Sequence, residues 1–135
     1  MSPSVFVDSG GFIAWLVAEE RRHSAADALF ASPPRKWMTS LAVVSETYGW
    51  FLLRQGEDAA RDFRLALADL PDLTLLEVDR SHHRAVERKL ERLRGRKLTY
   101  VDASSLLFLQ EHRVRTVWGT DLDLGLEGAT VTPGP

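Results

Sequence analysis

The sequence predicts an α/β fold with three layers, in which helices cover both faces of a central, mainly parallel sheet of four to five short strands. Short apolar runs alternate along the chain with longer stretches of helical periodicity. Strands separated by helices in this way are typical of parallel sheets. No repeat, low-complexity tract or internal linker divides the 135 residues, so we expect one domain over residues 1–135.

In the first half of the chain we expect two strands and four helices. The β-branched run Val5–Val7 predicts a buried strand, because a Gly-Gly turn signal follows it closely. The further predicted elements are helices over Phe12–Ala18 and His23–Phe30, a loop at Pro33-Pro34, a strand over Lys36–Met38, a helix over Leu41–Arg54 capped by Thr39 or Ser40, and a helix capped by Asp58 that runs to about Leu70.

In the second half, strands and helices alternate again. The predicted elements are a strand over Leu73–Val78, a helix over Ser81–Leu93 that Gly95 ends, a helix over Val101–His112, a strand over Arg115–Trp118 and a short last strand over Ala129–Val131. With the first half, these elements give the alternation that a parallel sheet requires.

Four acidic residues lie beside or within apolar runs: Asp8, Glu46, Asp102 and Asp121. Asp8 and Asp121 directly follow predicted strands. The other two lie in predicted helices that return across the same edge of the sheet. Because ligands bind parallel sheets outside the carboxyl ends of the strands, we expect all four carboxylates to converge at this edge.

A shared partner is the simplest reason for carboxylates to gather beside a core, because desolvating an unpaired charge is costly. The chain contains no cysteine and places no histidine set beside these acids. Such a cluster suits Mg²⁺ or Mn²⁺, which activate a water for in-line phosphodiester hydrolysis. P-loop, dinucleotide-binding and zinc-protease motifs are absent.

Taken singly, the aspartates also have structural explanations. Asp102 is an N-cap candidate, and Thr99 lies three residues before it, as in a capping box. Asp8 precedes a Ser-Gly-Gly turn. Glu46 lies in the middle of an apolar helical stretch, where neither role is open to it. The joint pattern therefore carries more weight than any single acid.

Charge is distributed unevenly. Between Arg80 and Lys97 there are eight Lys or Arg residues against two Glu, although the net charge of the chain is −2. This basic stretch is either a solvated helix face or a surface for an RNA backbone. The RNA-binding candidates are Arg84, Arg88, Arg92, Arg94, Arg96 and Lys97. We expect His82 and His83, on the same helix, to be solvated, and the four tryptophans to lie in the core or at a dimer interface.

Composition also bears on location. The absence of cysteine, of a secretory signal and of any apolar run long enough to span a bilayer favours an intracellular, cytoplasmic protein.

Five segments together resemble the PIN-domain ribonucleases, and within them the VapC-type toxins of type II toxin–antitoxin systems. The likeness covers essentially the whole chain. The segments are Val5–Ala14, His23–Ala26, Thr39–Glu46, Leu98–Ser105, and Gly119–Leu124 with Gly128 and Pro133 beyond it. At Leu124 the sequence departs from the family, which usually has an aromatic residue there.

The resemblance implies a metal-dependent endoribonuclease that hydrolyses RNA by a metal-activated water. Asp8, Glu46, Asp102 and Asp121 would be both its catalytic residues and its Mg²⁺ or Mn²⁺ ligands, with Asp123 a second candidate for the last ligand. Ser9, Thr99 and Thr120 would support them. The resemblance also implies an antitoxin partner and a homodimer. His23 matches a structural position of the family and is not expected to act as a base.

Two other classes of protein remain to be distinguished. A receiver-like signalling domain also has an acidic cluster on a parallel sheet, but it needs adjacent early acids and a late lysine, and here no lysine follows Lys97. A PIN-like module without catalytic activity would bind RNA or protein. Retention of all four acids argues against it, because an unneeded carboxylate cluster repels itself.

Overall fold

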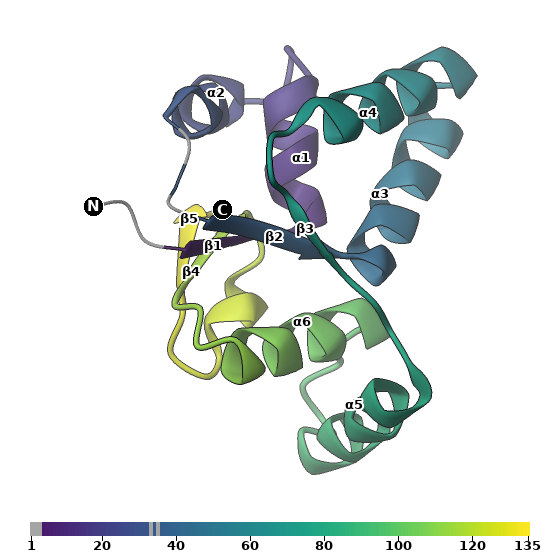
Figure 1. Cartoon of the computed structure of the whole chain (residues 1–135), viewed down its shortest axis with the longest axis vertical. Helices are drawn as coiled ribbons and strands as arrows, with labels where there is room; N and C mark the ends of the chain where they lie inside the picture. Colours follow the sequence, from purple (N-terminus) through teal and green to yellow (C-terminus); the bar gives the residue numbers. More distant parts are fainter. Residues whose placement is uncertain (1–3, 33, 35) are drawn as a thin grey trace.

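The computed structural model describes residues 4–32, 34 and 36–135. Its elements, in chain order, are β1 (Ser4–Val7), α1 (Ser9–Leu16), α2 (His23–Ala31), β2 (Lys36–Ser40), α3 (Leu41–Arg54), α4 (Glu57–Asp69), β3 (Thr74–Leu76), α5 (Arg80–Arg92), α6 (Tyr100–Glu111), β4 (Thr116–Gly119), the short 3₁₀ helix η1 (Leu122–Gly125) and β5 (Thr130–Pro133) (Figure 1). Of the predicted Pro33-Pro34 loop, Pro33 lies outside the described residues.

The five strands form one parallel sheet in the order β3-β2-β1-β4-β5. The chain first builds outwards from β1 through β2 to β3, and then returns to the other side of β1 to add β4 and β5. The order therefore reverses between β1 and β4. At such a switch point the connections leave in opposite directions, which opens a crevice at the carboxyl ends of the two strands.

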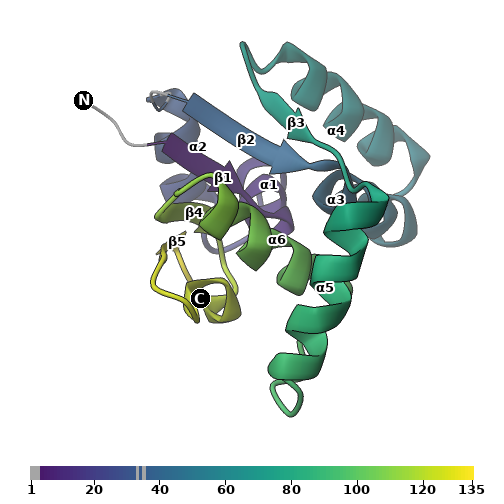
Figure 2. The ribbon, with the colours of Figure 1, turned by 60° about the horizontal axis from the view of Figure 1, so that its bottom comes forward.

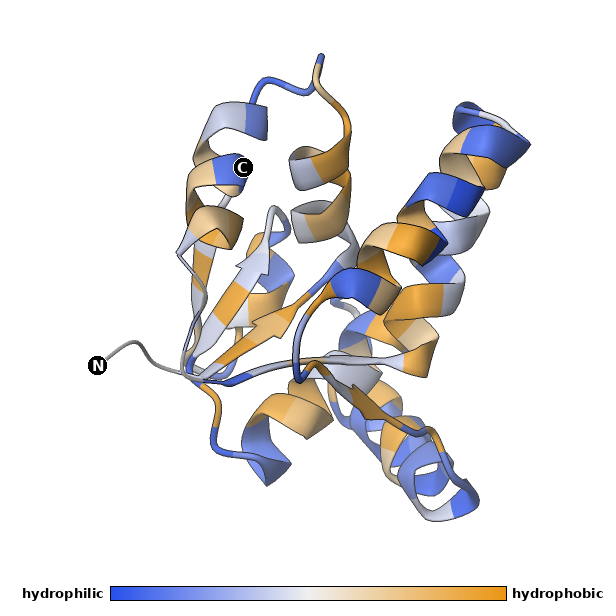
Figure 3. Ribbon diagram, turned by 45° about the horizontal axis from the view of Figure 1, so that its top comes forward, coloured by the Kyte–Doolittle hydropathy of each residue, from blue (hydrophilic) through white to orange (hydrophobic). Residues whose placement is uncertain are grey.

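Helices cover both faces of the sheet, as the sequence predicts. Helices α1 to α4 lie over one face, and α5, α6 and η1 lie on the other (Figure 1). Figure 2 shows α6 crossing the sheet, while α5 runs beside α6 and reaches beyond the sheet. Hydrophobic colour in Figure 3 gathers in the strands and on the helix sides that face them. Within the described residues, no helix is both long and apolar enough to cross a membrane.

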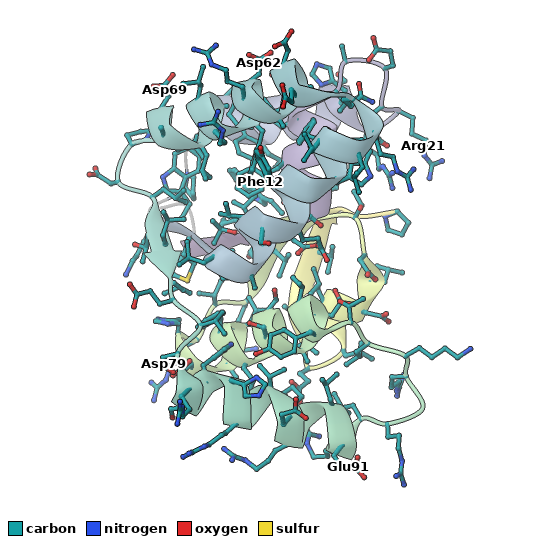
Figure 4. All side chains as sticks on the ribbon, turned by 90° about the vertical axis from the view of Figure 1, so that its right-hand side faces the viewer. Phe12, Arg21, Asp62, Asp69, Asp79 and Glu91 are labelled. Carbon is teal, nitrogen blue, oxygen red and sulfur yellow. The ribbon has the colours of Figure 1, made fainter. Side chains whose placement is uncertain are left out.

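Aromatic side chains fill the core between the sheet and helices α1 to α4. Phe12 points into this layer (Figure 4), and its ring packs edge-on against Phe63 at a centroid distance of 5.4 Å. Trp37 and Trp118 are buried and meet at 6.2 Å, which confirms a core role for these two tryptophans. Trp15 is half-buried and stacks on Phe30 at 4.1 Å.

Two helix starts differ from the prediction by more than one residue. Helix α1 begins at Ser9 rather than Phe12, because the Gly-Gly pair lies inside the helix instead of forming a turn before it. Helix α4 is capped by Gly56, whose φ of 99° favours glycine, and not by Asp58. Asp58 lies in the first turn instead, where its charge interacts favourably with the helix dipole.

Candidate active site

Asp8 and Asp121 approach each other from neighbouring strands. Asp8 follows β1, and its backbone N–H extends the β1–β4 pairing by donating to the Trp118 carbonyl at 2.9 Å. Asp121 lies two residues beyond the end of β4 and caps η1, accepting a hydrogen bond from the Asp123 N–H at 2.9 Å. Both acids therefore lie at the switch point of the sheet.

Glu46 and Asp102 come from helices on opposite faces. Glu46 is in the second turn of α3, whose N-cap Ser40 accepts a hydrogen bond from the Val43 N–H. Asp102 is in the first turn of α6. Both helices begin at the edge where the strands end, which Figure 4 views face-on. The structure thus brings all four predicted acids to this edge.

Asp8 is the most perturbed of these acids. Its side chain is 4 % exposed. Burial raises the pKa of its carboxyl from 3.8 to about 7, and the negative charge of Glu46 adds to the rise. A hydrogen bond from the Ser9 backbone opposes it, while Asp102 and Asp121 raise it further. The carboxyl thus feels all three other acids, which supports the predicted convergence.

Asp102 is both a helix-cap residue and a member of this cluster. The Thr99 hydroxyl accepts a hydrogen bond from the Asp102 N–H at 3.1 Å, and the Asp102 carboxylate accepts one from the Thr99 N–H at 3.3 Å. Thr99 is therefore the N-cap, and Asp102 is the third residue of the helix, which closes the capping box, and not the cap itself. Burial raises the pKa of Asp102, the Thr99 hydrogen bonds oppose this rise, and Asp121 and Glu46 add to it.

Burial does not extend to every acid. Glu46 and Asp121 are exposed, so the desolvation cost that suggested a shared partner does not apply to these two. Glu46 follows an apolar run in sequence, but the helical period turns its side chain out of the core. The burial argument for a shared partner therefore rests on Asp8 and Asp102.

Three carboxylates are already close enough to bind one ion together. Oxygen atoms of Asp102, Asp121 and Asp123 lie within 4.8 Å of one another. Asp121 and Asp123 are thus both within reach of an ion beside Asp102, and the last ligand stays open between Asp121 and Asp123. Asp8 and Glu46 are outside this set of three, although their charges act on it.

Three glycines allow the strands and helix α1 to close around Asp8. A Cβ at Gly10 would lie 2.3 Å from the Thr120 hydroxyl oxygen, and one at Gly11 would lie 2.3 Å from the Trp118 carbonyl. A Cβ at Gly119 would lie 3.2 Å from that of Asp8. The Gly-Gly pair that sequence reasoning assigned to a turn is therefore a close-packing requirement of the site.

The smaller polar residues predicted to support the acids lie at the same edge. The Ser9 backbone acts to lower the pKa of Asp8, and Thr99 holds Asp102. Thr120 approaches Gly10 closely. The predicted structural role of His23 is supported, because its Nδ1 donates to the Ala14 carbonyl at 2.9 Å and joins α2 to α1.

The basic stretch is divided between paired and solvated residues. Lys89, whose side chain is 3 % exposed, donates to Glu127 at 2.5 Å, and Arg92 donates to the other Glu127 oxygen at 2.9 Å. Burial raises the pKa of Glu127, but these two hydrogen bonds outweigh it and hold the pKa below its ordinary value. Arg94 pairs with Glu91. The remaining RNA-binding candidates, Arg84, Arg88, Arg96 and Lys97, are exposed and form no ion pair with any described residue.

The expectation of solvated histidines is wrong for His82. Its Nε2 shares a hydrogen bond with the Ser104 hydroxyl at 2.7 Å, and its ring stacks on Phe108 at 4.0 Å. Burial lowers the pKa of His82. Sequence reasoning missed this contact and the Lys89–Glu127 pair. The helical period was the available signal, because His82 and Lys89 lie with Val86 on the buried side of α5.

The acidic cluster fits a divalent cation. The Asp8 Oδ1 atom is buried and has no hydrogen-bond partner among the described residues. None of the four acids forms an ion pair with a described Lys, Arg or His. A site of carboxylate oxygens with no soft ligand suits Mg²⁺ or Mn²⁺.

The comparisons with known proteins agree with this geometry. The family model described as the PIN domain matches residues 5–125. Among solved structures, the chain resembles the VapC20 toxin of Mycobacterium tuberculosis, a toxin that cleaves the sarcin–ricin loop, with a TM-score of 0.85 and 27 % sequence identity. The match covers 93 % of this chain and 96 % of that one. Among curated proteins, none matches. The chain therefore belongs to the PIN domain family, and its likeness to the VapC-type ribonucleases of that family is confirmed.

Proposed function

We propose that this protein is an Mg²⁺- or Mn²⁺-dependent endoribonuclease and the toxin of a toxin–antitoxin pair. The observation that carries the proposal is the acidic cluster at the switch point, which includes a buried carboxylate oxygen without a partner. An anionic RNA backbone would be repelled by these acids unless a cation lay between them. The cluster and its substrate therefore need the same ion.

Asp8, Glu46 and Asp102 would hold the ion, together with Asp121 or Asp123. When bound, it would supply the positive charge that activates a water and stabilises the leaving oxygen of the phosphodiester. No covalent protein nucleophile is required for this reaction.

The chain's own residues fix the ligands before the ion arrives. The β1–β4 pairing holds the Asp8 backbone, the Thr99 N–H holds the Asp102 carboxylate, and the Asp123 N–H holds Asp121. Preorganised ligands of this kind reduce the cost of ordering the site on binding.

The proposed partners follow from the relatives. An RNA substrate, a cognate antitoxin protein, a homodimer and a cytoplasmic location are what a VapC-type toxin implies. Arg84, Arg88, Arg96 and Lys97 are the basic residues best placed to contact an RNA backbone, because they are exposed and form no ion pair with the described residues. VapC20 cleaves a ribosomal loop, which makes structured RNA with an exposed loop the first substrate to test.

Cleavage of total cellular RNA by the purified protein tests this function. We expect Mg²⁺- or Mn²⁺-dependent cleavage that EDTA stops and that Asp102→Asn reduces by about a hundredfold or more, since even residues behind metal ligands contribute tenfold to a hundredfold. Asp69→Asn, at the exposed end of α4 (Figure 4), is the matched control and should cut normally. An Asp102→Asn protein that cuts RNA at the parental rate would exclude this mechanism.

A PIN-like binding module without catalytic activity is the second candidate. Metal titration distinguishes the two, because an ion that binds only the folded protein stabilises it by about 2.7 kcal/mol at a hundred times its dissociation constant. We expect Mn²⁺ to raise the melting temperature of the parent but not that of Asp8→Asn. A parent that shows no shift would favour the inactive module.

A further inference from the structure

An aromatic pair lies on the surface where α5 meets α6, at the first residue of α6. The His83 Nδ1 and the Tyr100 hydroxyl are 2.8 Å apart and share a hydrogen bond. The two rings stack with centroids 5.7 Å apart and an angle of 25°. The His83 side chain is 50 % exposed and Tyr100 is half-buried. A stacked and partly exposed pair is a flat surface that another aromatic ring can extend.

This pair is close to the acids along the chain. Tyr100 directly follows Thr99, whose N–H is 3.3 Å from the Asp102 carboxylate. Because consecutive Cα atoms are about 3.8 Å apart, the Tyr100 backbone lies within a few ångströms of a proposed ion ligand. Helix α5, which carries His83, is visible from Asp79 to Glu91 in the same view as the carboxyl edge of the sheet (Figure 4).

The neighbouring histidine holds this surface in place. His82 is buried, is hydrogen-bonded to Ser104 and stacks on Phe108. These contacts fix α5 against α6 at the turn that carries His83, and Lys89 with Glu127 fixes the helix again two turns later. The aromatic pair is therefore presented by a rigid support, as a binding surface requires.

Exposed cations lie on both sides of the pair in the sequence. Arg84 follows His83, and Arg96 and Lys97 lie in the turn just before α6. None of the three forms an ion pair with a described residue, although Glu87 lies 3.8 Å from the His83 ring. Aromatic rings for bases together with free cations for phosphates are the combination that binds single-stranded nucleic acid.

We propose that His83 and Tyr100 form a base-stacking subsite for an unpaired nucleotide next to the bond that is cleaved. The proposal rests on the function proposed above and narrows its substrate class to RNA loops and single strands. A base in a duplex is already stacked on both faces and is not free to use the pair.

Binding of a short single-stranded oligoribonucleotide that contains 2-aminopurine tests the subsite. The background is Asp102→Asn, which should leave the RNA intact, and the readouts are the dissociation constant and the quenching of 2-aminopurine on stacking. We expect His83→Ala and Tyr100→Ala each to weaken binding about tenfold and to remove the quenching. Tyr100→Phe, which keeps the ring, should retain most of both.

His112→Ala is the matched control, because His112 is exposed at the opposite end of α6, and it should bind like the parent. Unchanged binding and quenching in both His83→Ala and Tyr100→Ala would overturn the subsite, as would equal binding of a fully paired duplex. So would a loss of antitoxin binding without any loss of RNA binding, because the pair would then be a protein-docking surface.

A second measurement removes the base instead of the protein ring. In the otherwise unsubstituted protein, an abasic residue at the stacking position should lower kcat/KM about tenfold, and it should have no further effect in Tyr100→Ala. Additive losses would overturn the subsite. If the protein binds RNA and stacks a base but never cleaves RNA, the proposed nuclease function fails and the stacking site stands. If the protein cleaves RNA and the His83 and Tyr100 variants cleave it equally well, the nuclease function stands and the stacking subsite fails.

Discussion

Two buried ionisable side chains of this molecule, Lys89 and Asp8, have opposite surroundings. The ammonium of Lys89 is enclosed by the protein and meets the Glu127 carboxylate, which Arg92 also contacts. The carboxyl of Asp8 is equally enclosed, but the charged groups that act on it are all acids, and one of its oxygens has no partner among the described residues.

The difference shows which charge serves the fold and which does not. A buried charge with its counter-charge inside the chain needs nothing further. A buried carboxylate among like charges raises the free energy of the folded protein, and it is retained only where something outside the chain relieves it. The Lys89 site is thus complete as it stands, and the Asp8 site needs a cation.

Asp8→Asn should produce the largest effect, because it should lower RNA cleavage and raise the stability of the metal-free protein. We expect RNA cleavage to fall by about a hundredfold or more, while the metal-free protein becomes more stable at pH 8. The measurements are cleavage rates and urea unfolding in EDTA. Asp27→Asn, which changes an exposed carboxylate on α2, should alter neither.

The sign of the stability effect follows from the pKa of Asp8, which is about 7 in the folded protein against an ordinary 3.8. The folded state holds this proton more tightly than the unfolded state does. The stability that this proton contributes is fully present below the unfolded-state pKa of 3.8, and it is lost as the pH rises through the folded-state pKa of about 7. The gain in Asp8→Asn should therefore shrink at pH 5; an Asn variant that is less stable than the parent at pH 8 would contradict the comparison.

Glu127→Gln should have the next largest effect, on stability alone. It leaves the Lys89 ammonium buried without a counter-charge, which costs about 3 kcal/mol. Arg92→Gln removes only the exposed arm of the same contact and should cost less than about 1 kcal/mol. Both are measured by urea unfolding at pH 7, and equal losses in the two variants would show that Lys89 finds another partner.

Thr99→Ala should have a smaller effect than Asp8→Asn or Glu127→Gln. Loss of the α6 N-cap costs about 1 kcal/mol, and it frees the Asp102 N–H that the Thr99 hydroxyl now satisfies. Thr99→Ser keeps a hydroxyl at this position and should retain most of the stability. If the serine variant unfolds as easily as the alanine variant, the cap does not act through its hydroxyl.

Features that depend on neighbours in sequence were predictable. Helix α3 has the predicted bounds, Leu41 to Arg54, with Ser40 as its cap, and the Thr99–Asp102 spacing does form a capping box. The order of strands and helices predicted a parallel sheet, which placed Asp8 and Asp121 at one edge. Local hydrogen bonds and periodicity decide all of these features, and both can be read from the sequence.

Features that depend on distant contacts were not. The burial of His82 requires Ser104 and Phe108 to lie under it, and that of Lys89 requires Glu127, 38 residues away. The start of α1 at Ser9 depends on how closely Thr120 and Trp118 approach the two glycines. No local pattern marks these partners, because a long side chain or a glycine accepts many surroundings.

The sequence by itself determined the class of fold, because residue order and hydrophobic period specify a parallel sheet and its carboxyl edge. Its motifs indicated the family by resemblance and predicted the set of acids. Only the tertiary structure decided which acids are buried, that Asp123 joins Asp102 and Asp121 within 4.8 Å, and which cations are already paired. Burial and pairing are properties of surfaces that meet only after folding, and they set the free energy of each charge in the folded protein.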